Sequence, residues 1–428
     1  MTREGRDRAV VAGGSPPGTD LAGTPPAQPR VSRRWVVAYV LAMVGIAAGW
    51  FGPIQILLPA QAARIAGDDG KEQLLALVTA SGAVASMVAN PLWGALSDRL
   101  RTRWGRRRPV AVAGTVVGVV GLLLLAAADS PATMAVGWAT VQIGLNGPMA
   151  ALAAMMADRV PEEQRGVVGA WFGIAQTIGL VVGTAVAVVA GEGPAGYVAI
   201  AVAVPALGVS ILLVHHEPPL GDRAPDGAVA APRPSWRALR PTADYAWVWT
   251  LRLLLNMVNA LLLLYLYYYL TDGIHVPDGS AGTWVLVLTG SAALVTVGVA
   301  AVGGVLSDRW GRRRVFVASS AVLLGASALV MATLPPLPVV MAATVLFGVG
   351  WGLYVSVDLA VLTAVLPDAS TRATMLGVGN VAASLPQVLA PVVAAPLVTS
   401  AGGYPLLYGV AAGLAVAALV GVRFLRVR

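Results

Sequence analysis

The sequence predicts an all-α membrane protein in which twelve transmembrane helices form two pseudo-symmetric six-helix bundles. Three observations predict this fold: an apolar composition, a series of long apolar runs and a repeated loop motif. Of the 428 residues, 57% are hydrophobic and 12% are charged, whereas soluble proteins carry about 25% charged residues. With a mean hydropathy of +0.75, the chain has too little polar surface to fold as a water-soluble globule.

Composition also excludes several classes of function. The chain has no cysteine, which excludes disulfides, thiolate metal sites and a cysteine nucleophile. Its three histidines leave little for a histidine-based metal or acid–base centre. We find no phosphate-binding Walker loop, no dinucleotide fingerprint and no cluster of metal ligands. We therefore expect a protein that is not an enzyme and that holds no metal and no cofactor.

The apolar runs predict the individual helices, because about 20 apolar residues cross a bilayer as one helix. Twelve runs are long enough: 35–63, 73–97, 109–128, 132–157, 167–190, 195–214, 245–271, 281–305, 315–333, 338–366, 373–399 and 404–425.

The segments between the runs divide the chain. Residues 1–34 are rich in Gly, Pro and Arg without an apolar run, which predicts a disordered tail. Residues 215–244 contain six prolines among small and charged residues, which is typical of a linker. We therefore expect two six-helix halves, 35–214 and 245–428.

The basic residues predict the orientation. If both termini are cytoplasmic, 26 of the 29 Lys and Arg residues lie on the cytoplasmic side, as the positive-inside rule requires. The net charge of +8 thus reflects the orientation of the chain in the cytoplasmic (inner) membrane. We expect the chain to contact the lipid bilayer and to bind no nucleic acid.

A loop motif occurs once in each predicted half. Residues 94–99 read Gly-Ala-Leu-Ser-Asp-Arg and 104–108 read Trp-Gly-Arg-Arg-Arg. Residues 304–314 repeat both parts without the intervening residues and with Val305 in the place of Ala95. Gly105 and Gly311 are 206 positions apart, as are Pro161 and Pro367. This repeat indicates duplicated halves, which are typical of transporters.

At these residues the sequence resembles the major facilitator superfamily over about 35–425. The longer first loop is most similar to the sucrose and glycoside:cation symporter branches. The resemblance implies a small-molecule substrate, the superfamily's usual monomer, and a central cavity surrounded by the first, fourth, seventh and tenth spans. Two features depart from related branches. Span five lacks the Gly-Pro typical of drug antiporters, and the first half lacks the intramembrane aspartates of melibiose-type sodium symporters.

The resemblance also implies that the loop motif forms a conformational latch, which holds the cytoplasmic faces of the helices together while the transporter is open to the outside. Aspartates at helix C-termini need compensating positive charge, which the arginines supply. The alternative is that the arginines only fix topology. The expected latch residues are Asp98, Arg99, Gly105, Arg106 and Arg107, and Asp308, Arg309, Gly311, Arg312 and Arg313.

Arg252 and Asp358 are the ionisable residues deepest within the predicted spans. A charge there costs about 3 kcal/mol or more, and the helical rise places both roughly 12 to 14 Å deep. We hypothesise an Arg252/Asp358 pair that lines the cavity, with Asp358 carrying a coupling proton. A fixed structural ion pair, or an Arg252 that reaches the headgroups, is the alternative.

Polar side chains on these spans indicate the substrate. One helical stripe contains Arg252, Asn256 and Asn259, and it should not face lipid.

The aromatic side chains have two expected roles. Trp50 and Trp351 are candidates for stacking on a sugar ring, although packing is the alternative. An interfacial belt is expected for Tyr265, Tyr267, Tyr268 and Tyr269. The remaining candidates are Gln55, Gln142, Asn146 and Tyr354.

These residues favour a mostly neutral, hydroxyl-rich solute. The sequence therefore predicts a secondary transporter of a sugar or glycoside that works by alternating access as a proton symporter. A proton-driven exporter of drugs or metabolites and an uncoupled uniporter remain open alternatives.

Overall fold

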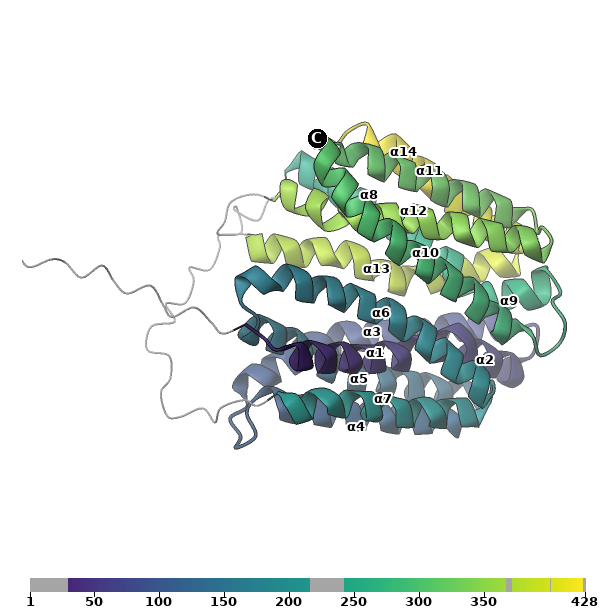
Figure 1. Ribbon diagram of the computed structural model, residues 1–428. Helices are drawn as coiled ribbons and strands as arrows, with labels where there is room; N and C mark the ends of the chain where they lie inside the picture. The colour runs from purple at the N-terminus through teal and green to yellow at the C-terminus, as the bar shows by residue number, and fades with distance from the viewer. Residues whose placement is uncertain (1–29, 216–241, 367–371, 401, 426–428) are drawn as a thin grey trace, which may run out of the picture.

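The computed structural model describes residues 30–215, 242–366, 372–400 and 402–425. Nearly all of the predicted tail and of the predicted linker lies outside these residues. The described chain is helical and contains no strand, and its helices form two bundles that lie side by side (Figure 1). The predicted fold class is confirmed.

The first bundle contains six helical spans. Its first span is continuous through a π-helical turn, so that α1, η1 and α2 together cross the molecule. The elements are α1 (Arg33–Gly52), η1 (Pro53–Leu57), α2 (Leu58–Ala66), α3 (Lys71–Arg99), α4 (Arg107–Ala126), α5 (Pro131–Arg159), α6 (Glu162–Ala190) and α7 (Pro194–Val214).

The second bundle also contains six spans, of which the first is broken near its end. The elements are α8 (Ala243–Leu264), α9 (Leu266–Tyr268), η2 (Tyr269–Gly273), α10 (Ala281–Trp310), α11 (Arg313–Ala332), α12 (Leu337–Ala364), α13 (Arg372–Thr399) and α14 (Gly403–Val422).

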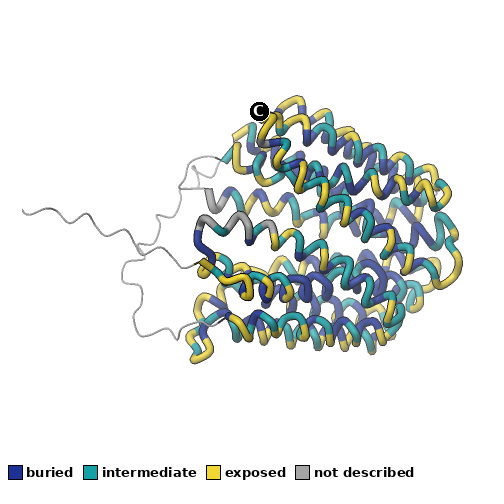
Figure 2. Tube along the Cα trace, viewed as in Figure 1, coloured by how far each residue is buried: buried dark blue, intermediate teal, exposed yellow. Residues whose placement is uncertain are grey.

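Eleven of the described helical segments are long and apolar enough to cross a membrane. The twelfth long segment, α5, has 29 residues but is less apolar because it carries Gln142, Asn146 and Pro148. Large apolar side chains are exposed on the outside of the bundles, with Val189 88% and Leu294 77% exposed, while buried residues line the faces between helices (Figure 2). This pattern is typical of helices whose outer faces contact lipid.

The two ends of the bundle differ. α1 begins and α14 ends at one end (Figure 1), which also holds the two glycines of the loop motif, Gly105 and Gly311. We call it the signature end. The opposite end holds α9 and the tyrosines of residues 265–269, and we call it the tyrosine end.

Close helix contacts depend on glycines that face a neighbouring backbone. On α6, a Cβ atom at Gly183 would lie 2.6 Å from the Ala48 carbonyl oxygen of α1 and 2.9 Å from the Gly52 nitrogen. Gly179 faces Ala47 in the same way. These small residues allow α1 and α6 to approach closely, as their four-residue spacing predicts.

Gly183→Ala therefore forces backbone to move, and we expect a loss of about 1 to 3 kcal/mol of stability. The measurement is the melting temperature of the purified protein in detergent. Gly173→Ala is the control on the same helix, because a Cβ there meets nothing within 4 Å. Equal melting temperatures for the two variants would contradict this account of the contact.

Candidate functional site

A cavity of about 440 Å³ lies between the two halves. α1, η1, α3, α5 and α6 line it from the first half, and α8 and α13 line it from the second. None of its lining residues is Asp, Glu, Lys, Arg or His. The cavity therefore offers hydrogen bonds and apolar surface without a formal charge.

Five primary amides line this cavity: Gln55, Gln142, Gln176, Asn259 and Gln387. Within the described residues, none of these side chains forms a hydrogen bond, although other amides of the bundle do. Asn146, for example, donates to Ser86 Oγ at 2.8 Å and to the Gln142 carbonyl at 2.7 Å. Because an amide without a partner is costly in an apolar bundle, five free amides at one cavity indicate a site for water or a polar solute.

The indoles of Trp50 and Trp138 complete one wall. Each ring nitrogen is buried without a hydrogen-bond partner among the described residues. Trp138 packs against Gly82, where a Cβ atom would lie 2.3 Å from the indole ring. Gly82 is thus required for the present position of this wall.

The structure brings together some of the predicted site residues and separates others. Gln55, Gln142, Asn259 and Trp50 line the cavity. Asn146 instead joins α5 to α3, and Trp351 packs against Tyr354 in a tilted arrangement with ring centroids 5.1 Å apart. The prediction missed Trp138, Gln176 and Gln387. The two glutamines lie within apolar runs, so a search of all spans for amides would have found them.

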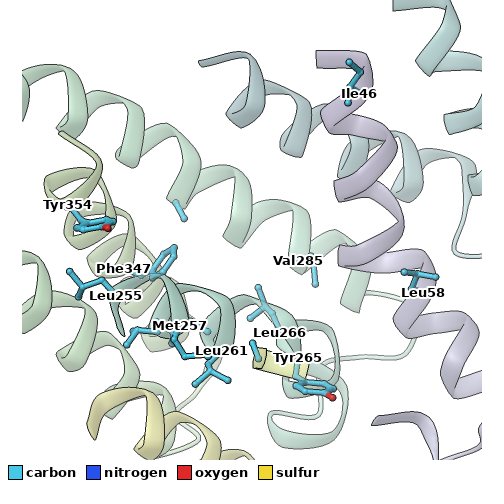
Figure 3. Close-up of a cluster of buried hydrophobic side chains, with 14 of the residues drawn as sticks. Ile46, Leu58, Leu255, Met257, Leu261, Tyr265, Leu266, Val285, Phe347 and Tyr354 are labelled. Atoms are coloured by element: carbon cyan, nitrogen blue, oxygen red, sulfur yellow. The ribbon is translucent and has the colours of Figure 1, made fainter. Parts of the chain in front are cut away.

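Arg252 and Asp358 are in contact in the second half. The Nη2 atom of Arg252 lies 3.1 Å from Asp358 Oδ2 and 3.4 Å from Asn380 Oδ1. Tyr354 donates its hydroxyl hydrogen to Asp358 Oδ1 at 2.6 Å and accepts from Asn256 Nδ2 at 3.2 Å. This charged cluster is set into buried apolar packing, since Tyr354 belongs to the same cluster of buried side chains as Leu255 and Phe347 (Figure 3).

The expectation that this pair lines the central cavity is wrong. Arg252, Tyr354 and Asp358 line a separate void of about 10 Å³, together with Val317 of α11 and Leu425, which follows α14. The reason is the length of the stripe on α8. Arg252 and Asn259 share a face but lie two turns apart, about 10 Å along the axis, so only Asn259 reaches the cavity.

The first copy of the loop motif forms a network around Arg107. Its guanidinium lies 2.6 Å from Asp98 and 3.1 Å from Asp158, and it donates to Ser97 Oγ at 3.0 Å. Arg106 adds a second bond to Asp158 at 2.9 Å. The network joins α3, α4 and α5, and Asp158 is a member that the sequence prediction missed.

The second copy is built differently. Arg313 donates to the Ala360 carbonyl of α12 at 3.3 Å. The side chain of Asp308 lies outside the described part. The position that corresponds to Asp158 at the 206-residue offset is Ala364, so this half lacks the second acid. Gly105 and Gly311 both have left-handed backbones, with φ of 85° and 60°, which explains the glycine in each copy.

The expected latch stays a prediction. The ion pairs that Arg106 and Arg107 form with Asp98 and Asp158 lie within the first half. Arg99, Arg309 and Arg312 form no ion pair with another described residue. In both copies the last arginine of the motif holds the sixth helix of its own half: Arg108 bonds the Leu212 carbonyl at 2.7 Å, and Arg314 the Arg423 carbonyl at 3.0 Å.

The predicted interfacial belt at the tyrosine end is also wrong for three of its four tyrosines. Tyr265, Tyr268 and Tyr269 are at most 1% exposed. The first two donate hydroxyl hydrogens to carbonyls of the other half, those of Glu72 at 3.1 Å and Pro59 at 2.8 Å. The break after α8 turns these side chains inward, so Tyr265 and Tyr268 join the halves, while Tyr269 donates to the Met331 carbonyl of its own half at 2.8 Å.

Comparisons with known proteins agree with this architecture. A family model described as Major Facilitator Superfamily matches residues 54–302 and 278–428. No curated protein matches the sequence. Among solved structures, a point mutant of the nucleoside transporter NupG is 14% identical with a TM-score of 0.71, covering 92% of this chain and 100% of NupG.

Two further solved structures have the same fold. The human organic anion transporter MFSD10 (TETRAN) is 18% identical with a TM-score of 0.65, covering 91% of this chain and 99% of that one. A bacterial homologue of the human lysosomal transporter Spinster, in an inward-facing and unoccupied conformation, is 16% identical with a TM-score of 0.61, covering 92% and 93%. At these identities the likeness concerns the fold.

Arg107→Ala removes the centre of the loop network and leaves two aspartates together. We expect a loss of about 1 to 2 kcal/mol, because both aspartates are partly exposed to solvent. The melting temperature in detergent measures it, with Arg99→Ala as the control from the same motif. If both variants melt like the unmodified protein, the network does not stabilise the first half.

Proposed function

The chain belongs to the major facilitator superfamily, and from this premise we propose that it carries a small, uncharged polar solute across the cytoplasmic membrane by alternating access. It is a transporter of small solutes, not an enzyme. The finer proposal is a proton symporter whose favoured solute is a sugar or glycoside.

The observation that carries the proposal is the chemistry of the cavity between the halves. Five free amides can both donate and accept hydrogen bonds, and two indoles supply ring faces. A volume of about 440 Å³ falls within the range of small-molecule sites, about 300 to 1,000 Å³. A neutral solute with several hydroxyl groups satisfies the amides and needs no counter-charge.

The same lining disfavours charged cargo. An organic anion or cation would lose its hydration in the cavity without an opposite charge among the lining residues, which is costly. A nucleoside, the cargo named for NupG, is also neutral and rich in hydroxyl groups. Nucleosides therefore belong beside sugars and glycosides in the solutes to be tested.

Proton coupling is proposed at Asp358. This carboxylate is joined through Tyr354 to Asn256, which lies one turn from the cavity residue Asn259 on α8. Protonation of Asp358 would weaken its ion pair with Arg252 and alter its bond with Tyr354. This chain of contacts provides a path from the charged cluster to the cavity wall without placing Asp358 in the cavity.

The orientation is part of the proposal. The positive-inside rule places the signature end, with its arginines, in the cytoplasm. The inter-half contacts at the tyrosine end then make the present conformation closed to the outside.

The experiment is solute flux into proteoliposomes under an imposed inward proton gradient, with a panel of sugars, glycosides and nucleosides. We expect gradient-driven uptake in the unmodified protein and loss of the gradient's effect in Asp358→Asn, because the amide cannot bind and release the proton. Uptake that ignores both gradient and substitution indicates a uniporter. Gradient-driven extrusion of apolar dyes, with no uptake from the panel, indicates an exporter.

A second prediction concerns the cavity amides. Asn259→Leu removes one donor and one acceptor from the wall, and we expect the apparent KM of uptake to rise about tenfold, the equivalent of about 1.4 kcal/mol. Gln73→Leu is the matched control, because Gln73 is exposed on α3 and does not line the cavity. An unchanged KM in Asn259→Leu would argue against solute binding at this amide.

A third prediction concerns the link through Tyr354. Tyr354→Phe keeps the ring but removes both hydroxyl bonds, so the dependence of uptake on the proton gradient should fall while solute binding is retained. Tyr408→Phe is the control, since the buried hydroxyl of Tyr408 has no partner among the described residues. Initial uptake rates with and without the gradient measure the effect. The proposed link fails if the two variants respond equally to the gradient.

A further inference from the structure

The contacts between the two halves are gathered at the tyrosine end. Every hydrogen bond and ion pair that the structure gives between described residues of different halves lies there. The donors and acceptors come from the end of α8, α9, η2 and the start of α10 in the second half, and from α2, the start of α3 and the loop between α6 and α7 in the first half. The tyrosine end is therefore where opening must break specific polar contacts.

Glu192 is the first of two charged residues that join the halves at the tyrosine end. It lies in the loop between α6 and α7 of the first half, and its carboxylate accepts from the Tyr267 hydroxyl at 2.5 Å and from the Gly282 backbone nitrogen at 3.2 Å. Gly282 is the second residue of α10 in the other half. The first N–H groups of a helix lack partners within it and carry partial positive charge. Glu192 thus caps α10 from the opposite half.

Gly282 suits this contact because it has no side chain. A Cβ atom at this position would lie 2.5 Å from the Glu192 carboxylate oxygen, so a larger residue would push the carboxylate away. Ser280, the residue before α10, forms no capping bond with the helix. The carboxylate of the other half takes that role.

Lys71 is the second charged residue that joins the halves at this end. This residue begins α3, is 6% exposed, and lies 2.8 Å from Asp272 of the other half and 3.0 Å from Asp68 of its own. Its ammonium group also lies 5.3 Å from the centre of the Tyr268 ring. Asp272 is held in turn by Tyr404, whose hydroxyl lies 3.2 Å away.

We propose that these two sets of contacts form a clasp between the halves. The clasp consists of Glu192 with Tyr267 and Gly282, and of Lys71 with Asp272. It holds the solute cavity closed to the outside and sets how often the cavity opens. The inference rests on the proposed function for the direction of opening. Each contact joins the halves only while the tyrosine end is closed. Removing one destabilises the closed state and shifts the population toward the outward-open state.

The test uses the absence of cysteine from the sequence. Ser384→Cys places one thiol in the cavity wall, and a membrane-impermeant thiol reagent is added to intact cells that express the chain. In this background we expect Glu192→Ala to increase the labelling rate about tenfold and Glu192→Gln to increase it less, since the amide still accepts one bond.

The matched control is Asp278→Ala. Asp278 is an exposed acid at the same end, in the loop before α10, and it forms no hydrogen bond or ion pair with another described residue. Its removal should leave the labelling rate unchanged. A separate Asp278→Cys variant, in an otherwise cysteine-free chain, should react from outside and so checks the orientation of the tyrosine end.

The outcomes separate the clasp from the transport proposal, because labelling requires no solute. If folded Glu192→Ala and Glu192→Gln label at the rate of the unmodified background, the clasp is overturned, whatever the flux experiments show. A rate that rises equally in Asp278→Ala also overturns it, since any lost charge at this end would then suffice. Faster labelling in the Glu192 variants alone supports the clasp, even if no tested sugar is transported.

A second measurement fixes the clasp shut. In the double variant Glu192→Cys and Gly282→Cys, a short bifunctional thiol reagent joins the loop to α10. We expect solute uptake to stop after cross-linking and to return when a reducible cross-linker is cleaved. Uptake that continues at full rate in the cross-linked protein shows that this contact need not open.

Discussion

The structure depends on one constraint: in an apolar helical bundle, each polar side chain must find a partner or face a space that holds one. Most polar groups here meet this constraint inside the protein. Gln61, for example, donates to two carbonyls of the first half and accepts from Tyr197. Five amides without a partner among the described residues are gathered around one cavity between the halves. Their unused hydrogen-bonding capacity is what identifies the site.

The same constraint divides the polar groups by task. Charged groups within the bundle are paired and lie away from the cavity: Arg252 with Asp358, and Arg107 with two aspartates at the signature end. At the tyrosine end, Lys71, Asp272 and Glu192 join the halves. Uncharged groups remain for the cavity, so a solute that enters meets hydrogen-bonding partners but no fixed charge. In the proposed function, selection against ions is a property of the lining itself.

Much of this architecture could be predicted from the sequence, because hydropathy and the loop repeat are local signals. The helical spans and the two halves follow from such signals, while the pairing of Arg252 with Asp358 follows from the similar depth of the two charges in their spans. What could not be predicted depends on rotation and on distance along helices. Asp358 and Asn259 both lie on polar stripes, but only the packing shows that one faces a small void and the other the cavity. The tyrosines of residues 265–269 have the composition of an interfacial belt, and only the structure after the break in α8 shows that Tyr265, Tyr267 and Tyr268 bond to the other half.

The central claim is that a neutral solute occupies the cavity lined by the free amides. The most direct measurement is protection of the Ser384→Cys thiol from a small thiol reagent in the purified protein by a neutral sugar or nucleoside, compared with a charged analogue such as a sugar acid. We expect saturable protection by a neutral solute and none by its charged analogue. Equal protection by both, or protection by the charged analogue alone, would contradict the account.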